Sequence, residues 1–315
     1  MYYKLVDWIN INEIDINWSL LSANPNAIDF LKENPKYINW IYLSSNRNSL
    51  DLIINNTNEI NIHYLCCNQN KEILKRFIYP IFTSLNRTDW GQLSLNPSAD
   101  FLLKENEDKI NFDCLCVNNS HDAIEILLKN IKKINYRLLS RNNNDKAIDL
   151  LLSNPSKINW REFSTNTNPK AITFLEQNSS KIVWREFSEN KNPKIFKLLD
   201  ENKDKLYWYY IASNPDDKII DFYFENRSHS LDIHALCMNT NFKIIELLKS
   251  SKNKLDKLDY KILCWNPSIF ILDYDKIANN YLKLELKEEL IKEVMHPRRV
   301  FKYPNYDYIE DLFGD

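Results

Sequence analysis

Apolar and small side chains recur three and four positions apart near the start of the chain. Trp18, Leu21 and Ser22 fall on one face of a first predicted helix, and Ala27 and Leu31 fall on one face of a second. Helices this short cannot bury their apolar faces by themselves, so neighbouring copies of the pair must stack. The pattern therefore predicts a pair of short amphipathic helices as the structural unit.

The helix pair is repeated along the chain. The block Leu21–Asn24 returns ten more times, mostly about 22–24 residues apart, and Asn closes every copy. Self-similarity sustained at a fixed period is typical of a solenoid. In chain order, copies 1 to 11 of the block are Leu21–Asn24, Leu43–Asn46, Leu65–Asn68, Leu93–Asn96, Leu115–Asn118, Leu139–Asn142, Phe163–Asn166, Phe187–Asn190, Ile211–Asn214, Leu236–Asn239 and Leu263–Asn266.

Asn is expected to begin and end these helices. Asn17 occupies the N-cap position of the first helix, and every copy has Asn or Asp there except those with Val183 and Tyr207. Asn24 can cap the second helix, with Pro25 in its first turn. The chain holds only two Gly, so we expect a second recurring Asn to take the left-handed position that ends the second helix. These residues are Asn34, Asn56, Asn106, Asn130, Asn154, Asn178, Asn202 and Asn226.

The predicted fold class is all-α, an α-solenoid of about eleven two-helix repeats of roughly 22–28 residues. Residues 1–15 are expected to cap one end, residues 16–274 to form the repeats, and residues 275–315 to supply a C-terminal helix and capping tail. At a packing distance of roughly 8–10 Å per helix, an open array of this kind would be about 90–110 Å long.

The repeat also resembles a known family. A unit of the form Ile-Asn-Trp-x-x-Leu-Ser-x-Asn-Pro-x-Ala-Ile-x-x-Leu is similar to the short helical repeats of many proteins of giant DNA viruses of protists, and Met295–Val300 resembles the closing segment of several such chains. The resemblance covers nearly the whole sequence. It implies a viral repeat protein made in the host cytoplasm, and it carries no assigned activity.

The composition argues against catalysis. Two Gly exclude a Walker loop, a dinucleotide fingerprint and a nucleophile elbow, and no His-Glu-x-x-His is present. Cys66, Cys116, Cys237 and Cys264 occupy the block position held elsewhere by Ser or, in one copy, Ala212. A small side chain is needed there, so these Cys are interpreted as packing residues. We expect no catalytic residue, no cofactor, no metal site and no disulfide.

One row of first-helix residues is a candidate for partner contact. The second residue after each Trp position points away from the predicted core, yet most members of this row are apolar or aromatic. Either the curvature of the array buries the row, or the row lines a groove for a partner. The candidate contact residues are Tyr42, Tyr64, Leu138 and Tyr210.

A short basic ladder is the second candidate. Arg137, Arg161 and Arg185 follow aromatic residues in consecutive copies, an arrangement that could bind RNA or DNA by stacking and phosphate contact. Glu162 and Glu186 lie beside them and favour a solvated ion-pair stripe instead. The Trp residues themselves are expected in the core.

The functional expectation is a non-enzymatic scaffold or adaptor that binds another protein along an extended surface. The alternatives are a nucleic-acid-binding solenoid that uses the basic ladder, and a structural component of a virion or viral factory. The net charge of −2 gives no global attraction to nucleic acid or anionic lipid. No apolar run approaches the roughly 18 residues that span a bilayer, and no signal peptide is evident. We therefore expect a protein of the host cytoplasm without membrane partners.

Overall fold

The computed structural model describes residues 2–9, 16–227 and 231–283. The chain divides into two compact units, one of residues 5–270 and one of residues 1–4 with 271–315. Helices dominate the described residues, and the strands among them are three residues long each. No helix among those residues has the length and apolar content to cross a membrane. The all-α prediction is confirmed at this level.

The unit of residues 5–270 alternates first and second helices. The first helices are α1 (Trp18–Ala23), α3 (Trp40–Ser45), α5 (Ile62–Leu65), α7 (Arg87–Leu95), α9 (Phe112–Val117), α11 (Tyr136–Leu139), α13 (Trp160–Ser164), α15 (Trp184–Phe187), α17 (Trp208–Ala212), α19 (Ile233–Met238) and α21 (Lys257–Leu263). The second helices are α2 (Ile28–Glu33), α4 (Leu50–Ile54), α6 (Lys71–Ile73), α8 (Asp100–Glu105), α10 (His121–Lys129), α12 (Asp145–Leu152), α14 (Pro169–Gln177), α16 (Phe196–Glu201), α18 (Asp217–Asn226) and α20 (Phe242–Ser250).

Most second helices are followed by a short 3-10 turn that the sequence pattern did not predict, such as Pro35–Tyr37 after α2 and Ser179–Lys181 after α14.

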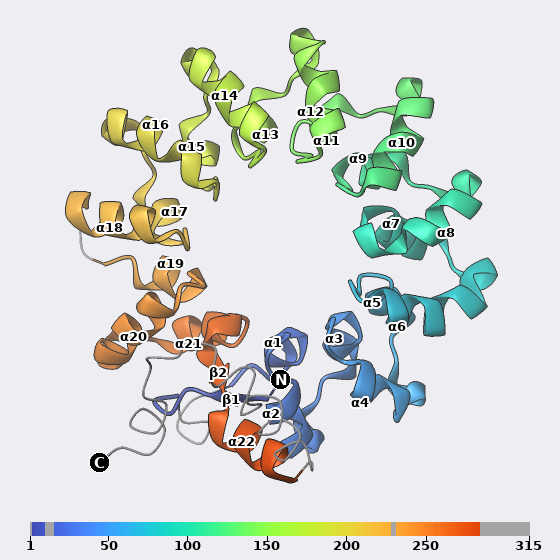
Figure 1. The fold of residues 1–315 in the computed structure, drawn as a ribbon, viewed down its shortest axis with the longest axis vertical. Coiled ribbons are helices and arrows are strands. Elements are labelled where there is room, and N and C mark those ends of the chain that lie inside the picture. Colours follow the sequence, from blue (N-terminus) through green and yellow to red (C-terminus); the bar gives the residue numbers. More distant parts are fainter. Residues whose placement is uncertain (1, 10–15, 228–230, 284–315) are drawn as a thin grey trace, which may run out of the picture. The chain divides into compact units, whose positions relative to one another are not determined.

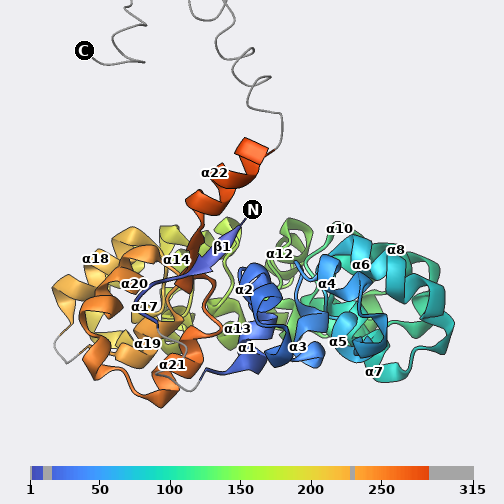
Figure 2. The ribbon, with the colours of Figure 1, turned by 90° about the horizontal axis from the view of Figure 1, so that it is seen from below.

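The first helices lie on the inner side of a ring and the second helices on the outer side (Figure 1). Seen from the edge, α1, α3 and α5 lie in one layer and α2, α4 and α6 in the next (Figure 2).

The Asn that closes each block joins one copy to the copy before it. Its side-chain N–H groups donate to backbone carbonyls of the preceding block; Asn46, for example, donates to Ser22 O at 3.0 Å and Asn24 O at 2.8 Å. The same side chain accepts from the backbone N–H two residues later. Each of these Asn residues is buried. An unpaired polar group would be costly in this core, so the amide is a specific cross-link and not only a helix cap.

The Ser of the block forms a second cross-link. Ser164 Oγ donates to Trp160 O at 2.7 Å and accepts from the backbone N–H of Val183, in the next copy, at 3.0 Å. Where Cys116 replaces Ser, its sulfur accepts from the Asn135 N–H at 3.3 Å. The prediction that this position holds a small packed side chain is confirmed by burial, but it overlooked the hydrogen bond between copies.

The ladder of Asn side chains does not stop at the first copy. Asn24 donates to Cys264 O and Asn266 O, each at 3.1 Å, and so bonds copy 1 to copy 11. Asn26 donates to Pro267 O at 3.0 Å across the same junction. We call this junction the seam. The expectation of an open array with separate ends is therefore wrong, because copy 11 presents to copy 1 the same two acceptors that most copies present to the next copy.

Two expectations about Asn need correction. The Asn residues that end the second helices, from Asn34 to Asn202, have φ between −120° and −139°, so they are not left-handed. Instead, their amides donate to the carbonyl four residues earlier, as Asn34 does to Phe30 O at 2.9 Å. This bond pairs a carbonyl that a helix end would otherwise leave free.

The N-cap prediction is confirmed for six copies and wrong for three. Asn17 and its counterparts in α3, α5, α9, α11 and α13 accept from the backbone N–H three residues later. Asp232 makes no side-chain cap bond. Asp89 and Asp259 lie inside α7 and α21, because these helices begin one turn earlier at the capping boxes of Asn86 and Asp256. Val183 and Tyr207, the expected exceptions, form no side-chain cap bond.

The terminal segments form a small sheet. Strands β1 (Tyr3–Leu5) and β2 (Phe270–Leu272) pair with each other, and α22 (Tyr274–Lys283) follows β2. Of the predicted caps at residues 1–15 and 275–315, the structure describes residues 2–9 and 275–283, and the remainder lies outside the described residues. Their described parts belong to, or directly follow, one shared sheet, whereas an open array would place them at opposite ends.

The Trp row is less buried than predicted. Trp90 is 3 % exposed, but Trp18, Trp160 and Trp184 are half-buried. Each stacks or packs against aromatic rings of its own copy, as Trp160 does against Phe174 with ring centroids 5.9 Å apart. Trp18 and Trp160 therefore pack against the second helix of their copy, and Trp184 packs within its own helix. The fully buried core lies at the Leu and Ser positions.

Candidate functional site

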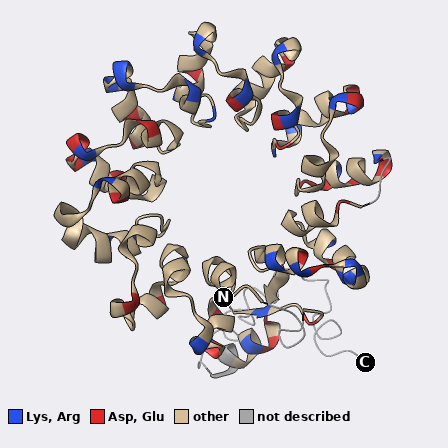
Figure 3. Ribbon diagram, turned by 180° about the vertical axis from the view of Figure 1, so that it is seen from behind, with Lys and Arg blue, Asp and Glu red and all other residues tan. Residues whose placement is uncertain are grey.

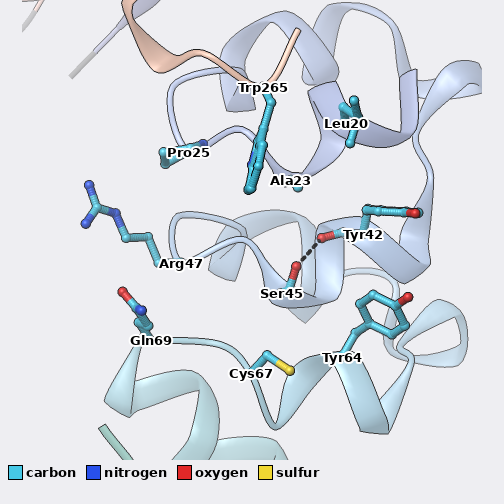
Figure 4. A pocket seen from close by; sticks show the side chains of 10 residues that line it. All are labelled: Leu20, Ala23, Pro25, Tyr42, Ser45, Arg47, Tyr64, Cys67, Gln69 and Trp265. Atoms are coloured by element: carbon cyan, nitrogen blue, oxygen red, sulfur yellow. Dashed lines mark hydrogen bonds between the residues drawn. The ribbon is translucent and has the colours of Figure 1, made fainter. Parts of the chain in front are cut away.

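The first-helix layer carries an open pocket at the seam. Its volume is about 640 Å³, and its walls come from copies 1, 2, 3 and 11 (Figure 4). The lining residues are Leu20, Ala23, Pro25, Tyr42, Ser45, Arg47, Tyr64, Cys67, Gln69 and Trp265. They occupy three equivalent positions of the repeat: two and five residues after the Trp position, and the residue after the block Asn. We call this the seam pocket.

Tyr42 and Tyr64, two of the predicted contact residues, lie together in the seam pocket. They stand at the same position of α3 and α5, and their ring centroids are 5.7 Å apart. Both are half-buried, as is Leu20 at the same position of α1. The row is therefore neither fully buried by curvature nor fully exposed, and in copies 1 to 3 it forms the apolar wall of a concave surface.

Two important residues of the seam pocket escaped sequence reasoning. Trp265 is 66 % exposed, and it lies beside Ala23 although 242 positions separate them along the chain. It occupies the third position of its block, where the other copies have mostly small, polar or aliphatic residues, and this departure was the available signal. Arg47 follows the block Asn of copy 2, at a loop position where Pro recurs in four copies and the other copies vary.

The other two predicted contact residues lie in copies 6 and 9, away from the seam pocket. Leu138 is half-buried on α11, and Tyr210 is half-buried on α17. The Tyr210 hydroxyl accepts a hydrogen bond from Arg185 at 2.6 Å, and the Arg185 guanidinium lies 5.4 Å from the Tyr210 ring centroid. None of these three residues lines the seam pocket, so the structure does not bring the predicted contact residues into one site.

The basic ladder is engaged in ion pairs. Arg137 Nε lies 3.4 Å from Glu162, and Arg161 Nε lies 2.7 Å from Glu186, so each Arg pairs with a carboxylate of the next copy. Arg185 lies 3.4 Å from the same Glu186. Glu186 itself is buried. The ladder is thus an ion-pair stripe between copies, which agrees with the second interpretation of the sequence.

Charged side chains of the second helices also form ion pairs between neighbouring copies. Lys32 pairs with Asp51 at 3.2 Å, Lys71 with Asp100 at 2.7 Å and Lys170 with Asp149 at 2.6 Å. Figure 3 shows basic and acidic residues side by side on successive outer helices. These surface pairs contribute little stability each, and they place opposite charges next to each other on neighbouring second helices.

The buried thiols lack the features of reactive cysteines. Burial raises the pKa of the Cys66 thiol to about 12, with a further contribution from the nearby Asp89 carboxylate. Burial also raises the thiol pKa of Cys116, Cys237 and Cys264. Among the described residues, no group of three or more His, Cys, Asp or Glu side chains is placed to hold a metal ion. The His63 and His234 rings instead contact buried carboxylates of the next copy, those of Asp89 at 3.0 Å and Asp259 at 3.4 Å.

Comparison with known proteins adds no family to this geometry. The sequence matches no protein-family model and no curated protein, and the structure matches no solved structure. The functional conclusion therefore rests on the chain's own residues.

Proposed function

We propose that residues 5–270 form an α-solenoid of eleven repeats closed into a ring, and that this ring is a non-enzymatic scaffold that binds another protein. The resemblance to repeats of giant-virus proteins supports a viral scaffold in the host cytoplasm as its setting. The binding surface in this proposal is the seam pocket on the first-helix layer.

One observation carries the proposal: Trp265 is 66 % exposed beside the half-buried Tyr42 and Tyr64. A large aromatic side chain left in water is unfavourable unless a partner covers it, at roughly 25 cal/mol per Å² of apolar surface. Trp and Tyr are also the residues that most often dominate the binding energy of protein interfaces. The pocket is open and shallow, which suits a protein surface or segment more than an enclosed small molecule.

The basic ladder supports a nucleic-acid role less well. A phosphate that approaches Arg161 would compete with Glu186, whose oxygen already lies 2.7 Å from the guanidinium. Breaking such pairs would offset part of the favourable release of counterions that drives nucleic-acid binding. Protein binding is therefore our proposal, and nucleic-acid binding is an outcome that the following experiment can reveal.

The test is an affinity purification of the tagged full chain from the host cell, with and without nuclease, followed by mass spectrometry. We expect one stoichiometric protein that resists nuclease and is lost with the double variant Tyr42→Ala/Tyr64→Ala. The matched control is Tyr210→Ala, which alters the same helix position on the other side of the ring and should retain the partner. Retention that disappears with nuclease, or that is unchanged in the double variant, would overturn the proposal.

A further inference from the structure

The two sides of the seam pocket differ in chemistry: one is aromatic and the other is polar. Tyr42 and Tyr64 form one side, Arg47 and Gln69 form the other, and Trp265 lies between them (Figure 4). A side chain entering the pocket would meet aromatic faces at one side and hydrogen-bond donors at the other. The pocket therefore has requirements for both the shape and the charge of its occupant.

The charge of the pocket is positive and uncompensated. Arg47 is the one charged residue among those that line it, and no acidic residue lines it. Within the described part of the chain, the Arg47 guanidinium has no ion pair, whereas Arg137, Arg161 and Arg185 each contact a carboxylate. An occupant with a carboxylate near Arg47 would gain a charge-assisted hydrogen bond. A basic occupant would instead be repelled by it.

The aromatic side of the pocket sets the second requirement. The rings of Tyr42 and Tyr64 are tilted by 50° to each other, and Trp265 offers a further exposed ring. Aromatic side chains pack well in edge-to-face and offset arrangements on such surfaces. A purely apolar occupant would cover Arg47 without pairing it, which carries a desolvation cost.

We infer that the seam pocket binds a partner's peptide segment that carries aromatic side chains next to acidic ones. This inference rests on the proposed protein-binding function and specifies the partner's chemistry. It also makes binding depend on ring closure, because Trp265 comes from copy 11 while Tyr42, Tyr64 and Arg47 come from copies 2 and 3.

The experiment uses the full chain and two fluorescein-labelled synthetic octapeptides. The acidic probe has the sequence Glu-Tyr-Glu-Phe-Glu-Tyr-Glu-Leu, and the basic probe has Lys at each Glu. We expect fluorescence anisotropy to show preference for the acidic probe. Arg47→Glu should weaken binding of the acidic probe about tenfold and make the chain prefer the basic probe. Trp265→Ala should weaken binding of both probes.

The matched control is Lys191→Glu, which makes the same charge change at the equivalent position of copy 8, on the far side of the ring. It should leave the binding of both probes unchanged. Equal affinity for the two probes, or equal effects of Arg47→Glu and Lys191→Glu, would overturn the inference. In either case, if the Tyr42→Ala/Tyr64→Ala variant still loses the purified partner, the proposed protein-binding function stands. Only the inferred preference for an acidic segment then fails.

Discussion

Two junctions of the ring use nearly identical bonds but differ in how the chain connects them. Between copies 5 and 6, Asn142 donates to Cys116 O and Asn118 O, both at 2.9 Å. At the seam, Asn24 donates to Cys264 O and Asn266 O, both at 3.1 Å.

The difference is covalent. Copies 5 and 6 are also joined by the chain through α10 and the turn Ile131–Lys133, whereas copies 11 and 1 meet only through non-covalent contacts within residues 5–270. A junction held by the chain cannot separate far when its bonds break. The seam can separate while every other junction stays folded, because stability in a repeat array is a sum over neighbouring interfaces.

The first and largest test of this comparison replaces the two equivalent amides separately. Asn142→Leu should lower the free energy of unfolding by about 2–4 kcal/mol, because two buried carbonyls lose their donors. Asn24→Leu should cost less stability but increase the radius of gyration, because the seam opens and water pairs its carbonyls. Chemical denaturation and small-angle X-ray scattering measure the two quantities. An unchanged radius in Asn24→Leu would show that the remaining seam contacts hold the ring closed.

A second test concerns the Ser or Cys of the block. Copies 6, 7 and 8 use Ser140, Ser164 and Ser188, whereas copies 3, 5, 10 and 11 use Cys. Ser164→Ala should lower the free energy of unfolding by about 1–2 kcal/mol, because the Val183 N–H loses its acceptor. Ser164→Cys should cost less, since a thiol can still accept weakly, as in copy 5. Equal losses, measured by urea unfolding, would mean that small size alone is required there.

The smallest expected effect is at alkaline pH. The pKa of the Cys66 thiol is raised to about 12 from an ordinary value of 9.0, mainly by burial. The unfolded chain therefore releases this proton at a lower pH than the folded chain, and stability falls as the pH rises above 9.0. Cys66→Ser should reduce the loss between pH 8 and pH 10, as followed by equilibrium unfolding. Parallel losses in the wild type and the variant would contradict a role for this thiol.

Local features were predictable from the sequence because each is repeated. The helix pairs, the buried Leu and Ser positions and the junction-forming Asn appear in every copy or nearly every copy, so chance variation at one site does not hide them. The role of Asn was misjudged, since a single copy suggests a cap or a left-handed residue. Its bonds to the preceding copy, as from Asn46 to Ser22, involve a neighbour that the local pattern does not specify.

The sequence by itself therefore determined the helix pairs and the buried Leu and Ser positions, because these depend on spacing within one repeat. Only the tertiary structure decided that copy 11 meets copy 1, because closure depends on a small rotation between neighbours accumulated over the whole array. Closure of the ring also forms the seam pocket, because it brings copy 11 next to copies 1 to 3. Tyr42 was recognisable from its row, but its neighbour Trp265 lies in the last copy, and no periodicity in the sequence indicates that the two share one surface.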